Sequence, residues 1–384
     1  MNEDAEMSAI VASGMTRFGK RKEDLLSLGG ESALPILRKY RSDIDFLLVS
    51  NSYSGEFNSI SGINTLLATY LSLDGVPSLR VDNTSGSGGT AIFLADMLIK
   101  SGQARAVLVT GLEKMSTMDT RHVTSVIASL LPEEERRQGP SLPSLAALLA
   151  QLYMRRYGAS RESLAQVSVK NHRNGAANPY AHIQKEVTLE EVMQSPVVAE
   201  PLRQYEFSPI SDGAASVLVV GDGDAESFTD RPVYIKAVSL ASDSASVTAR
   251  GDLMGLEAVR RAGRNAMRLS GISKPDFAEL HDMATVLELV QMESLGLCEP
   301  GEAWKMVLEG ETEVGGSMPV NTSGGLNSKG HPIGASGVAQ VVEAFSQIRK
   351  ECGGRQVKDA RTGLCLSMSG FGNSAAVTVL GDEP

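Results

Sequence analysis

Cysteine is scarce in this sequence, and the scarcity narrows the possible functions. The chain has three cysteines among 384 residues, Cys298, Cys352 and Cys365. Three is an odd number, and the spacings are not those of zinc ligands. We therefore expect no disulfide framework and no metal site in this chain, and a reducing, cytoplasmic location.

The sequence also lacks an excess of basic residues and any long apolar run. Lys and Arg number 36 against 46 Asp and Glu, a formal net charge of −10. Nucleic acids and anionic membranes would repel such a chain overall, so neither is an expected partner. No apolar run approaches the roughly 20 residues of a membrane span. The acidic N-terminus (MNEDAEMSAIVASG) lacks the basic-then-apolar order of a signal peptide.

The sequence alternates helical and β-rich segments, as α/β proteins do, and the chain is long enough for two domains. Helical patterns at 90–101 and 338–349 alternate with β-rich runs, which predicts a largely parallel, buried sheet. The β-rich runs cover residues 9–13, 46–50, 106–111, 215–220, 233–239, 365–368 and 375–380.

The chain resembles itself at a coarse level. Residues 45–51 (DFLLVSN) are similar to 276–282 (DFAELHD), and 212–219 (DGAASVLV) to 372–379 (GNSAAVTV). We therefore expect two similar halves, one formed by 1–114 with 202–225 and the other by 232–384. Residues 115–201 interrupt the first half. We predict that they form an inserted loop domain over a ligand site. A surface segment without a functional role would have the same composition.

The strongest motif is a glycine-rich segment at 321–337 (NTSGGLNSKGHPIGASG). Glycine clusters indicate tight turns and close approach of the main chain to another group. We expect a helix to begin near Ser336, with its free N–H groups facing the loop. His331 lies just before that helix, beside Pro332, where it can serve as a base or an oxyanion donor.

Three weaker elements accompany this motif. Ser85 lies in a second glycine-rich turn, 81–91 (VDNTSGSGGTA), ahead of a helix, where helix capping is the simpler explanation. A His281–Asp282 pair ends a strand-like run. Gly370 belongs to the turn 369–372 (SGFG), whose amides could bind an oxyanion.

Together these segments resemble the thiolase superfamily. The match of 321–337 to the thiolase histidine motif is the most specific, and 208–218 (SPISDGAASVL) resembles the end of the family's first half. Residues 107–115 (VLVTGLEKM) and 167–179 (VSVKNHRNGAANP) resemble sterol-carrier-protein-type and archaeal acetyl-CoA acetyltransferase-like thiolases. The resemblance implies a duplicated five-layer α-β-α-β-α fold with an inserted loop domain over coenzyme A.

The resemblance also implies roles for individual residues. The family's nucleophilic cysteine falls on Ser85 and its activating histidine on His331. The water-holding residue falls on His281, and Asn321 belongs to the catalytic motif. The thioester oxygen would lie between the main-chain N–H groups of Ser85 and Gly370. Contacts to coenzyme A would come from Ser323 and Gly324.

The departures from the family pattern affect the expected chemistry. The two positions of the family's second thiol fall on Met368 and Met283. A serine hydroxyl is far harder to ionise than a thiol, so ordinary thiolase turnover is not expected. The sequence predicts an acyl-CoA enzyme that makes or breaks a C–C bond next to a thioester, with or without a covalent intermediate.

Alternatives and partners follow from the same resemblance. One alternative is a retro-aldolase that works with a small zinc-ribbon/OB-fold protein. The other is a non-catalytic subunit of a complex that binds coenzyme A. Either way, the resemblance implies a homodimer or a dimer of dimers and an acyl-CoA ligand.

Overall fold

The computed structural model describes residues 7–384. The prediction that the chain has no signal peptide rests on the acidic N-terminal segment. Part of that segment lies outside the described residues. Within the described part, no helix combines the length and the apolar character that crossing a bilayer requires.

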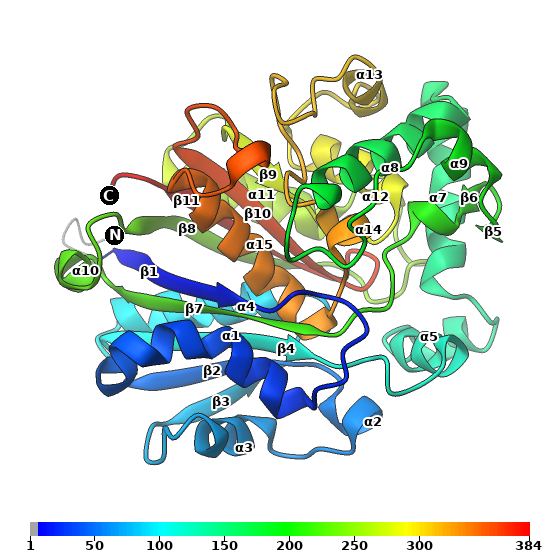
Figure 1. Ribbon diagram of the computed structural model, residues 1–384. Coiled ribbons are helices and arrows are strands. Elements are labelled where there is room, and N and C mark those ends of the chain that lie inside the picture. The colour runs from blue at the N-terminus through cyan, green and yellow to red at the C-terminus, as the bar shows by residue number, and fades with distance from the viewer. Residues whose placement is uncertain (1–6) are drawn as a thin grey trace.

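A nine-stranded sheet runs through both halves of the molecule (Figure 1). Its strands follow the order β3-β2-β4-β7-β1-β8-β11-β10-β9. The bounds are β1 Ser8–Met15, β2 Phe46–Ser50, β3 Ser78–Val81, β4 Ala106–Glu113, β7 Gly213–Gly221, β8 Val233–Ser242, β9 Phe277–Glu279, β10 Thr362–Ser369 and β11 Ser374–Gly381. All seven β-rich runs expected from the sequence are strands here.

The prediction of a largely parallel sheet was wrong. β2 pairs in parallel with β3 and β4, and β9 pairs in parallel with β10, but the other pairings are antiparallel. A strand covered by helices on both faces reads as one continuous apolar run whatever the direction of its neighbours. β7 is such a strand, since every one of its residues is buried.

The two halves repeat the same strand order. The first runs β3-β2-β4-β7-β1. In the second, Val320 bridges in parallel to Ala278 of β9, so the order becomes Val320 bridge-β9-β10-β11-β8. β1 and β8 join the two half-sheets through the register pairs Ser8–Ile235, Ala9–Tyr234 and Ile10–Val233.

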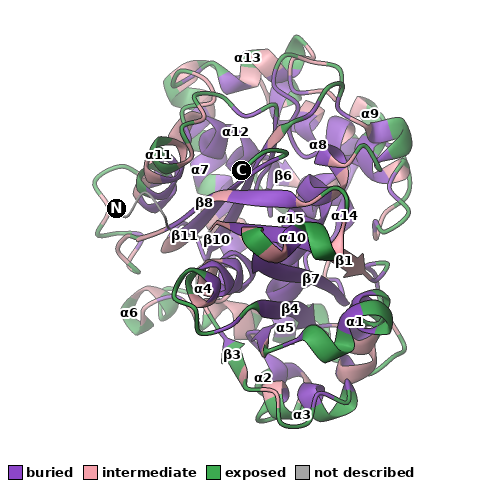
Figure 2. Cartoon of the chain, turned by 90° about the vertical axis from the view of Figure 1, so that its left-hand side faces the viewer, coloured by how far each residue is buried: buried purple, intermediate pink, exposed green. Residues whose placement is uncertain are grey.

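The helices form three layers around these half-sheets, which completes the α-β-α-β-α arrangement. α4 Ser87–Lys100 and α15 Ile333–Ile348 lie between the half-sheets and share a hydrophobic core with both. α1 Leu25–Tyr40 and α3 Ile63–Tyr70 cover the outer face of the first half. α11 Glu257–Ser270 and α12 Thr285–Ser294 cover the second. Figure 2 shows the buried strands at the centre, with exposed residues on the outer helices.

The segment between β4 and β7 adds several helices beside the second half. Their bounds are α5 Thr120–Ala128, α6 Glu133–Arg136, α7 Leu142–Tyr157, α8 Arg161–Ala176 and α9 Leu189–Gln194, followed by the hairpin strands β5 Val197–Ala199 and β6 Leu202–Arg203. Asp119, Ser141 and Ser160 cap α5, α7 and α8 through their side-chain oxygens.

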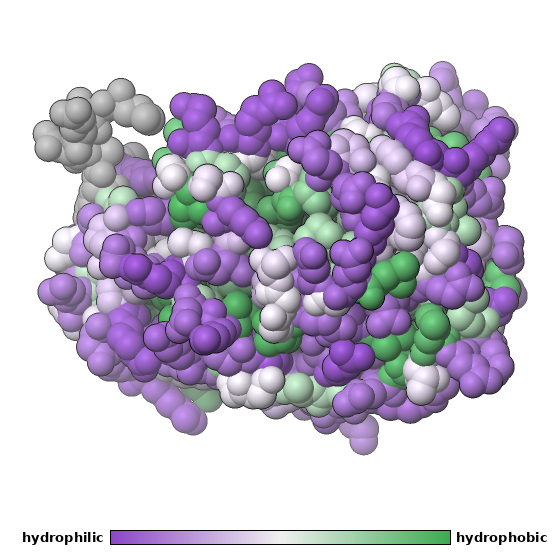
Figure 3. Space-filling view, turned by 90° about the horizontal axis from the view of Figure 1, so that it is seen from above, coloured by the Kyte–Doolittle hydropathy of each residue, from purple (hydrophilic) through white to green (hydrophobic). Residues whose placement is uncertain are grey.

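Four short helices complete the chain, α2 Ser54–Asn58, α10 Asp222–Phe228, α13 Ala303–Leu308 and α14 Gly325–Lys329. The surface seen from above is largely hydrophilic, with apolar side chains in separate groups between polar ones (Figure 3).

Candidate functional site

The site lies where the two central helices begin. An ideal Cβ on Gly88 of α4 would lie 2.6 Å from the Cα of Gly337 in α15. No other residue fits there, so the glycines let the two helix backbones touch near their N-terminal ends. Ser85 precedes α4 and His331 precedes α15. The contact therefore brings these two predicted site residues to one place.

α15 begins at Ile333, three residues before the expected position near Ser336. Pro332 occupies the N-cap position with a ring-fixed φ of −68°, and the helix begins at the next residue. His331 is consequently held between a glycine of positive φ, Gly330 at 108°, and the rigid first turn of the helix.

The hydrogen bonds around His331 favour one tautomer of its ring. Ser336 Oγ lies 2.9 Å from the Pro332 carbonyl oxygen and 2.7 Å from His331 Nδ1. Both contacts are hydrogen bonds at once only when the hydroxyl donates to the carbonyl and Nδ1 donates to the hydroxyl. This tautomer leaves His331 Nε2 unprotonated and able to accept a proton.

Burial keeps both histidines of the site neutral. Loss of hydration lowers the pKa of His331 to about 4. The pKa of His281 lies well below 6.5, first because of burial and second because of His331. The two rings stand edge to face with centroids 4.9 Å apart. Within residues 7–384, neither ring nitrogen of His281 has a hydrogen-bond partner.

The turn around Ser85 is tied to the end of β10. Thr84 adopts a positive φ of 44°, and its hydroxyl lies 2.6 Å from that of Ser369. Ser367 Oγ donates to the Ser85 carbonyl at 3.2 Å. Among the hydrogen bonds of the described residues, none uses the N–H of Ser85 or of Gly370. Two unpaired amides on adjacent turns suit the binding of an oxyanion. The oxyanion role stays a prediction.

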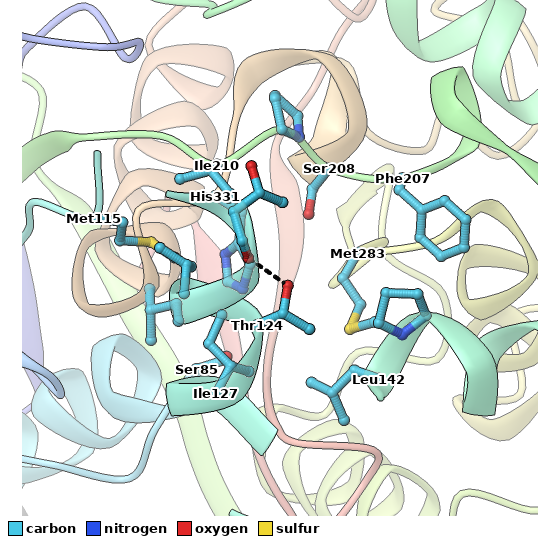
Figure 4. A pocket seen from close by; sticks show the side chains of 15 residues that line it. Ser85, Met115, Thr124, Ile127, Leu142, Phe207, Ser208, Ile210, Met283 and His331 are labelled. Carbon is cyan, nitrogen blue, oxygen red and sulfur yellow. Dashed lines mark hydrogen bonds between the residues drawn. The ribbon is translucent and has the colours of Figure 1, made fainter. Parts of the chain in front are cut away.

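An apolar cavity of about 180 Å³ adjoins Ser85 and His331 (Figure 4). Met283, one of the two predicted second-thiol positions, lines it, whereas Met368 lies against Gln291, whose Nε2 is 3.8 Å from its sulfur. None of the cysteines lines the cavity. Burial raises the pKa of Cys298 to about 12 and that of Cys365 well above its usual range. No described thiol is thus placed or activated for chemistry here.

Asn321 lies away from the cavity. Its Nδ2 donates to Glu288 at 2.7 Å, and its Oδ1 accepts from the Leu280 N–H at 2.7 Å. The residue is fully buried and has a positive φ of 55°. Both ends of the side chain are therefore occupied, and this geometry supports a positioning contact better than the predicted catalytic one.

Ser323 and Gly324 are likewise not among the residues that line the cavity. The Ser323 N–H donates to Glu279 at 3.0 Å and its hydroxyl donates to the same carboxylate. A Cβ on Gly324 would lie 2.8 Å from the Cα of Gly175. The glycine thus serves the packing of α8 against the second half, and the contact of Ser323 and Gly324 with coenzyme A stays a prediction.

The sequence analysis missed Glu113, a fully buried carboxyl at the end of β4. It accepts hydrogen bonds from Asn51 Nδ2, Ser52 N, Tyr53 N and Gly334 N at 2.8 to 3.1 Å. Burial outweighs these bonds and raises its pKa to about 7. Glu113 therefore ties the loop after β2 to the first turn of α15, which carries His331. An acidic residue at the end of an otherwise apolar strand was the available signal.

The analysis also missed how α8 is anchored to the second half. Lys170 pairs with Glu288 at 2.6 Å, with both side chains at most 1% exposed. Asn171 donates to Asp282 at 2.9 Å, and Asp282 accepts the Leu326 N–H at the start of α14. Asn174 and Asn178 donate to the carbonyls of Asn321 and Ser323. Three polar side chains of α8, followed by Asn178, in a segment rich in Lys and Asn were the available signal.

Comparison with known proteins agrees with this arrangement. Residues 6–222 match the family described as thiolase, N-terminal domain, and residues 239–382 match thiolase C-terminal domain-like. The chain belongs to the thiolase family. Members of this thiolase family use acyl-CoA substrates.

Two curated relatives span nearly all of this thiolase-family chain. The acetyl-CoA acetyltransferase of Methanothermobacter thermautotrophicus is 38% identical over 378 residues, covering 97% of this chain and 98% of its own. Sterol carrier protein 2 of Bos taurus is 32% identical over 391 residues, covering 96% and 71%. These matches confirm the resemblance stated from the sequence.

Among solved structures, one described as an Ltp2-ChsH2(DUF35) aldolase superimposes with a TM-score of 0.84 at 25% identity. The match covers 98% of both chains. The thiolase-family fold of this chain is thus shared by relatives named for acyl transfer and by one named for aldol chemistry. Residues 7–384 contain no group of three or more His, Cys, Asp or Glu side chains placed to hold a metal ion.

Proposed function

We propose that this chain breaks or makes a C–C bond next to a CoA thioester by aldol-type chemistry, without a covalent thiol intermediate. One observation carries the proposal. His331 presents an unprotonated Nε2 to a cavity that contains no thiol. Aldol chemistry needs a base and a site for an enolate oxygen, whereas thiolase turnover needs a nucleophilic thiol as well.

In the cleavage direction, His331 Nε2 takes the proton of the β-hydroxyl of a 3-hydroxyacyl-CoA. The Cα–Cβ bond breaks, its electron pair enters the thioester as an enolate, and the β-carbon leaves as an aldehyde or ketone. The N–H groups of Ser85 and Gly370 stabilise the enolate oxygen. His331 then returns the proton to Cα, which gives the shortened acyl-CoA.

The segment 115–201 would act as the loop domain over coenzyme A. Its helices α5 and α7 supply cavity residues such as Val123 and Leu142, opposite Ser85 and His331. A homodimer or a dimer of dimers is part of the proposal. So is a zinc-ribbon/OB-fold partner. The two-part name of the Ltp2-ChsH2(DUF35) aldolase favours a complex with a second protein.

The half-reaction can be tested without knowing the partner or the full substrate. In D2O, an enzyme that forms the enolate exchanges Cα hydrogens of an acyl-CoA for deuterium, which mass spectrometry detects. We expect exchange in the wild type and its loss in His331→Gln. Absence of exchange, with acyl-CoA binding confirmed in the same sample, would instead indicate a non-catalytic binding subunit.

Acyl transfer through Ser85 is the second candidate, because Ser85 lines the cavity and curated relatives are named acetyl-CoA acetyltransferases. Intact mass after incubation with acyl-CoA separates the two. An adduct of acyl mass at Ser85 would replace the non-covalent proposal, and we expect none.

A further inference from the structure

Several separate parts of the chain form the walls of the cavity beside Ser85 and His331. α5 and the start of α7 form one side, the loop 207–210 a second, and Met115 and Ile333 a third, with Met283 near Phe207 (Figure 4). Its apolar lining consists of Met115, Val123, Ile127, Leu142, Pro143, Phe207, Pro209, Ile210, Met283 and Ile333. The two catalytic candidates lie at its inner surface, so a group bound here would be joined directly to the reacting carbon.

Charge is missing from this lining. No Asp, Glu, Lys or Arg is among the described residues that line the cavity. Its polar members besides Ser85 and His331 are Thr120, Thr124 and Ser208, and the Thr124 hydroxyl is already donated to the Thr120 carbonyl at 2.8 Å. A carboxylate bound here would lose its hydration without gaining a cation, which is strongly unfavourable.

The size of the cavity sets the size of the group. A protein cavity of about 150 Å³ lined by Leu, Ile and Phe accommodates benzene. At about 180 Å³, this cavity is large enough for a six-carbon group and much larger than an acetyl methyl requires. The thioether side chains of Met115 and Met283 are flexible and can adapt to straight or ring-shaped groups.

We propose that the cavity binds an uncharged, apolar acyl chain or ring of about six carbon atoms and rejects acyl groups that carry a terminal carboxylate. The inference rests on the proposed function for the placement of the thioester carbon beside Ser85 and His331. It deepens that function by assigning the substrate class. The discriminating surface consists of Ile127 on the α5 side and of Phe207 and Ile210 on the loop 207–210.

Binding of non-cleavable alkyl-CoA thioethers tests the inference independently of turnover. Each methylene buried in the cavity contributes ~0.8 kcal/mol, roughly a fourfold tightening of Kd. We expect this gain from ethyl to about hexyl and a plateau or a loss beyond. An ω-carboxyalkyl thioether should bind at least about 100-fold more weakly than the alkyl thioether of equal length. A Kd independent of chain length, or no penalty for the carboxylate, would overturn the inference.

Two variants locate the effect. Ile127→Phe and Ile210→Phe fill the cavity from different walls, and each should remove the gain between ethyl and hexyl while leaving ethyl-CoA binding within about threefold. Leu148→Phe is the control, because Leu148 is 52% exposed on α7 and does not line the cavity. If either folded filling variant kept the wild-type chain-length profile, the assignment would be wrong.

Turnover separates the inference from the function on which it rests. Chain-length-dependent binding without deuterium exchange would overturn the proposed function and leave the substrate class standing. Deuterium exchange combined with a Kd that does not depend on chain length would overturn the substrate class and leave the proposed function standing.

Discussion

The two halves of the molecule share one architecture but hold their functional loops differently. In the first half, the turn before α4 presents Ser85, and the buried carboxyl of Glu113 receives N–H donors without an ion pair. In the second, the turn before α15 presents His331, and each of the buried carboxylates Glu279, Glu288 and Glu343 has a cation. Duplication therefore fixed the backbone positions of the two turns and left their chemistry free to diverge.

The difference has an electrostatic consequence. Burial raises the pKa of an unpaired carboxyl, and Glu113, at about 7, is only partly ionised at neutral pH. Glu288 pairs with Lys170, and removing one partner of such a buried pair is costly. Of these two carboxyls, Glu113 is thus sensitive to pH near neutrality, and Glu288 is sensitive to the loss of its cation.

The largest expected effect is on catalysis in the second half. His331→Gln removes the proposed base, and we expect kcat/KM or the exchange rate to fall by about 10²- to 10⁴-fold. His122→Gln is the matched control, since His122 lies on the exposed side of α5 with its ring bonded to Asp119. If the His331 variant kept more than about a tenth of the activity, the base would have to be another residue.

The low pKa of His331 also predicts the pH profile. With a pKa of about 4, the ring stays unprotonated down to acidic pH. We therefore expect the free enzyme's kcat/KM to be level from pH 8 to about 5.5 and to fall only nearer 4. A fall in kcat/KM near pH 6.5 would mean that burial does not lower the pKa of His331 as described.

Next in size is the ion pair that anchors α8. Lys170→Met leaves Glu288 buried without its cation, which costs about 3–5 kcal/mol in the free energy of unfolding. Lys185→Met, which breaks an exposed pair with Glu191, should cost less than about 1 kcal/mol. Urea unfolding measures both, and similar losses would contradict the contrast between a buried and a surface pair.

A smaller, pH-dependent effect is expected in the first half. The folded chain holds a proton on Glu113 up to about pH 7 and the unfolded chain only up to about 4.5. Its contribution to stability therefore falls as the pH rises through this window, by roughly 3 kcal/mol in all. Glu113→Gln cannot titrate, so the stability difference between wild type and variant should shrink between pH 4.5 and 7.

Urea unfolding at pH 5, 6, 7 and 8 checks this trend. Glu186→Gln, at an exposed position, provides the baseline. If the difference in free energy of unfolding between wild type and Glu113→Gln stayed constant or grew with pH, Glu113 would be ionised over this whole pH range.

The smallest expected effect is that of Ser85→Ala. The variant keeps the main-chain N–H, so a non-covalent mechanism should lose less than about tenfold in kcat/KM. A loss beyond about 10³-fold would make the hydroxyl the nucleophile.

Most of the architecture could be predicted from the sequence, because β-rich runs, glycine turns and the internal similarity are local signals. Seven strands, the helices α4 and α15 and the repeat followed from them. Strand direction did not follow, since apolar runs like that of β7 look alike in parallel and antiparallel sheets. The predicted start of α15 was three residues too late. Pro332 had been considered only as a constraint on His331, and its effect on where the helix begins was left out.

The candidate site was partly predictable. The glycine-rich turn before a helix identified His331, and the resemblance to thiolases identified Ser85. The structure places both at one cavity. Glu113 and Lys170 escaped notice, because a buried charge is recognisable only through partners such as Gly334 and Glu288 that are distant in sequence. For Asn321, membership of the glycine-rich motif does not separate residues that touch a ligand from residues that shape the loop, so its catalytic role stays a prediction.

The anchoring of α8 has a consequence for recombination within the family. Residues 115–201 interrupt the first half in sequence, yet Lys170, Asn171, Asn174 and Asn178 are bound to the second half. A chimaera that exchanges this segment alone would bring donors from one parent to acceptors from the other. A working exchange would therefore have to include two separate stretches of sequence. Residues 115–201 must be replaced together with Asp282, Glu288 and the 321–324 turn, although the hydrogen-bonded partners are more than a hundred positions apart in the sequence.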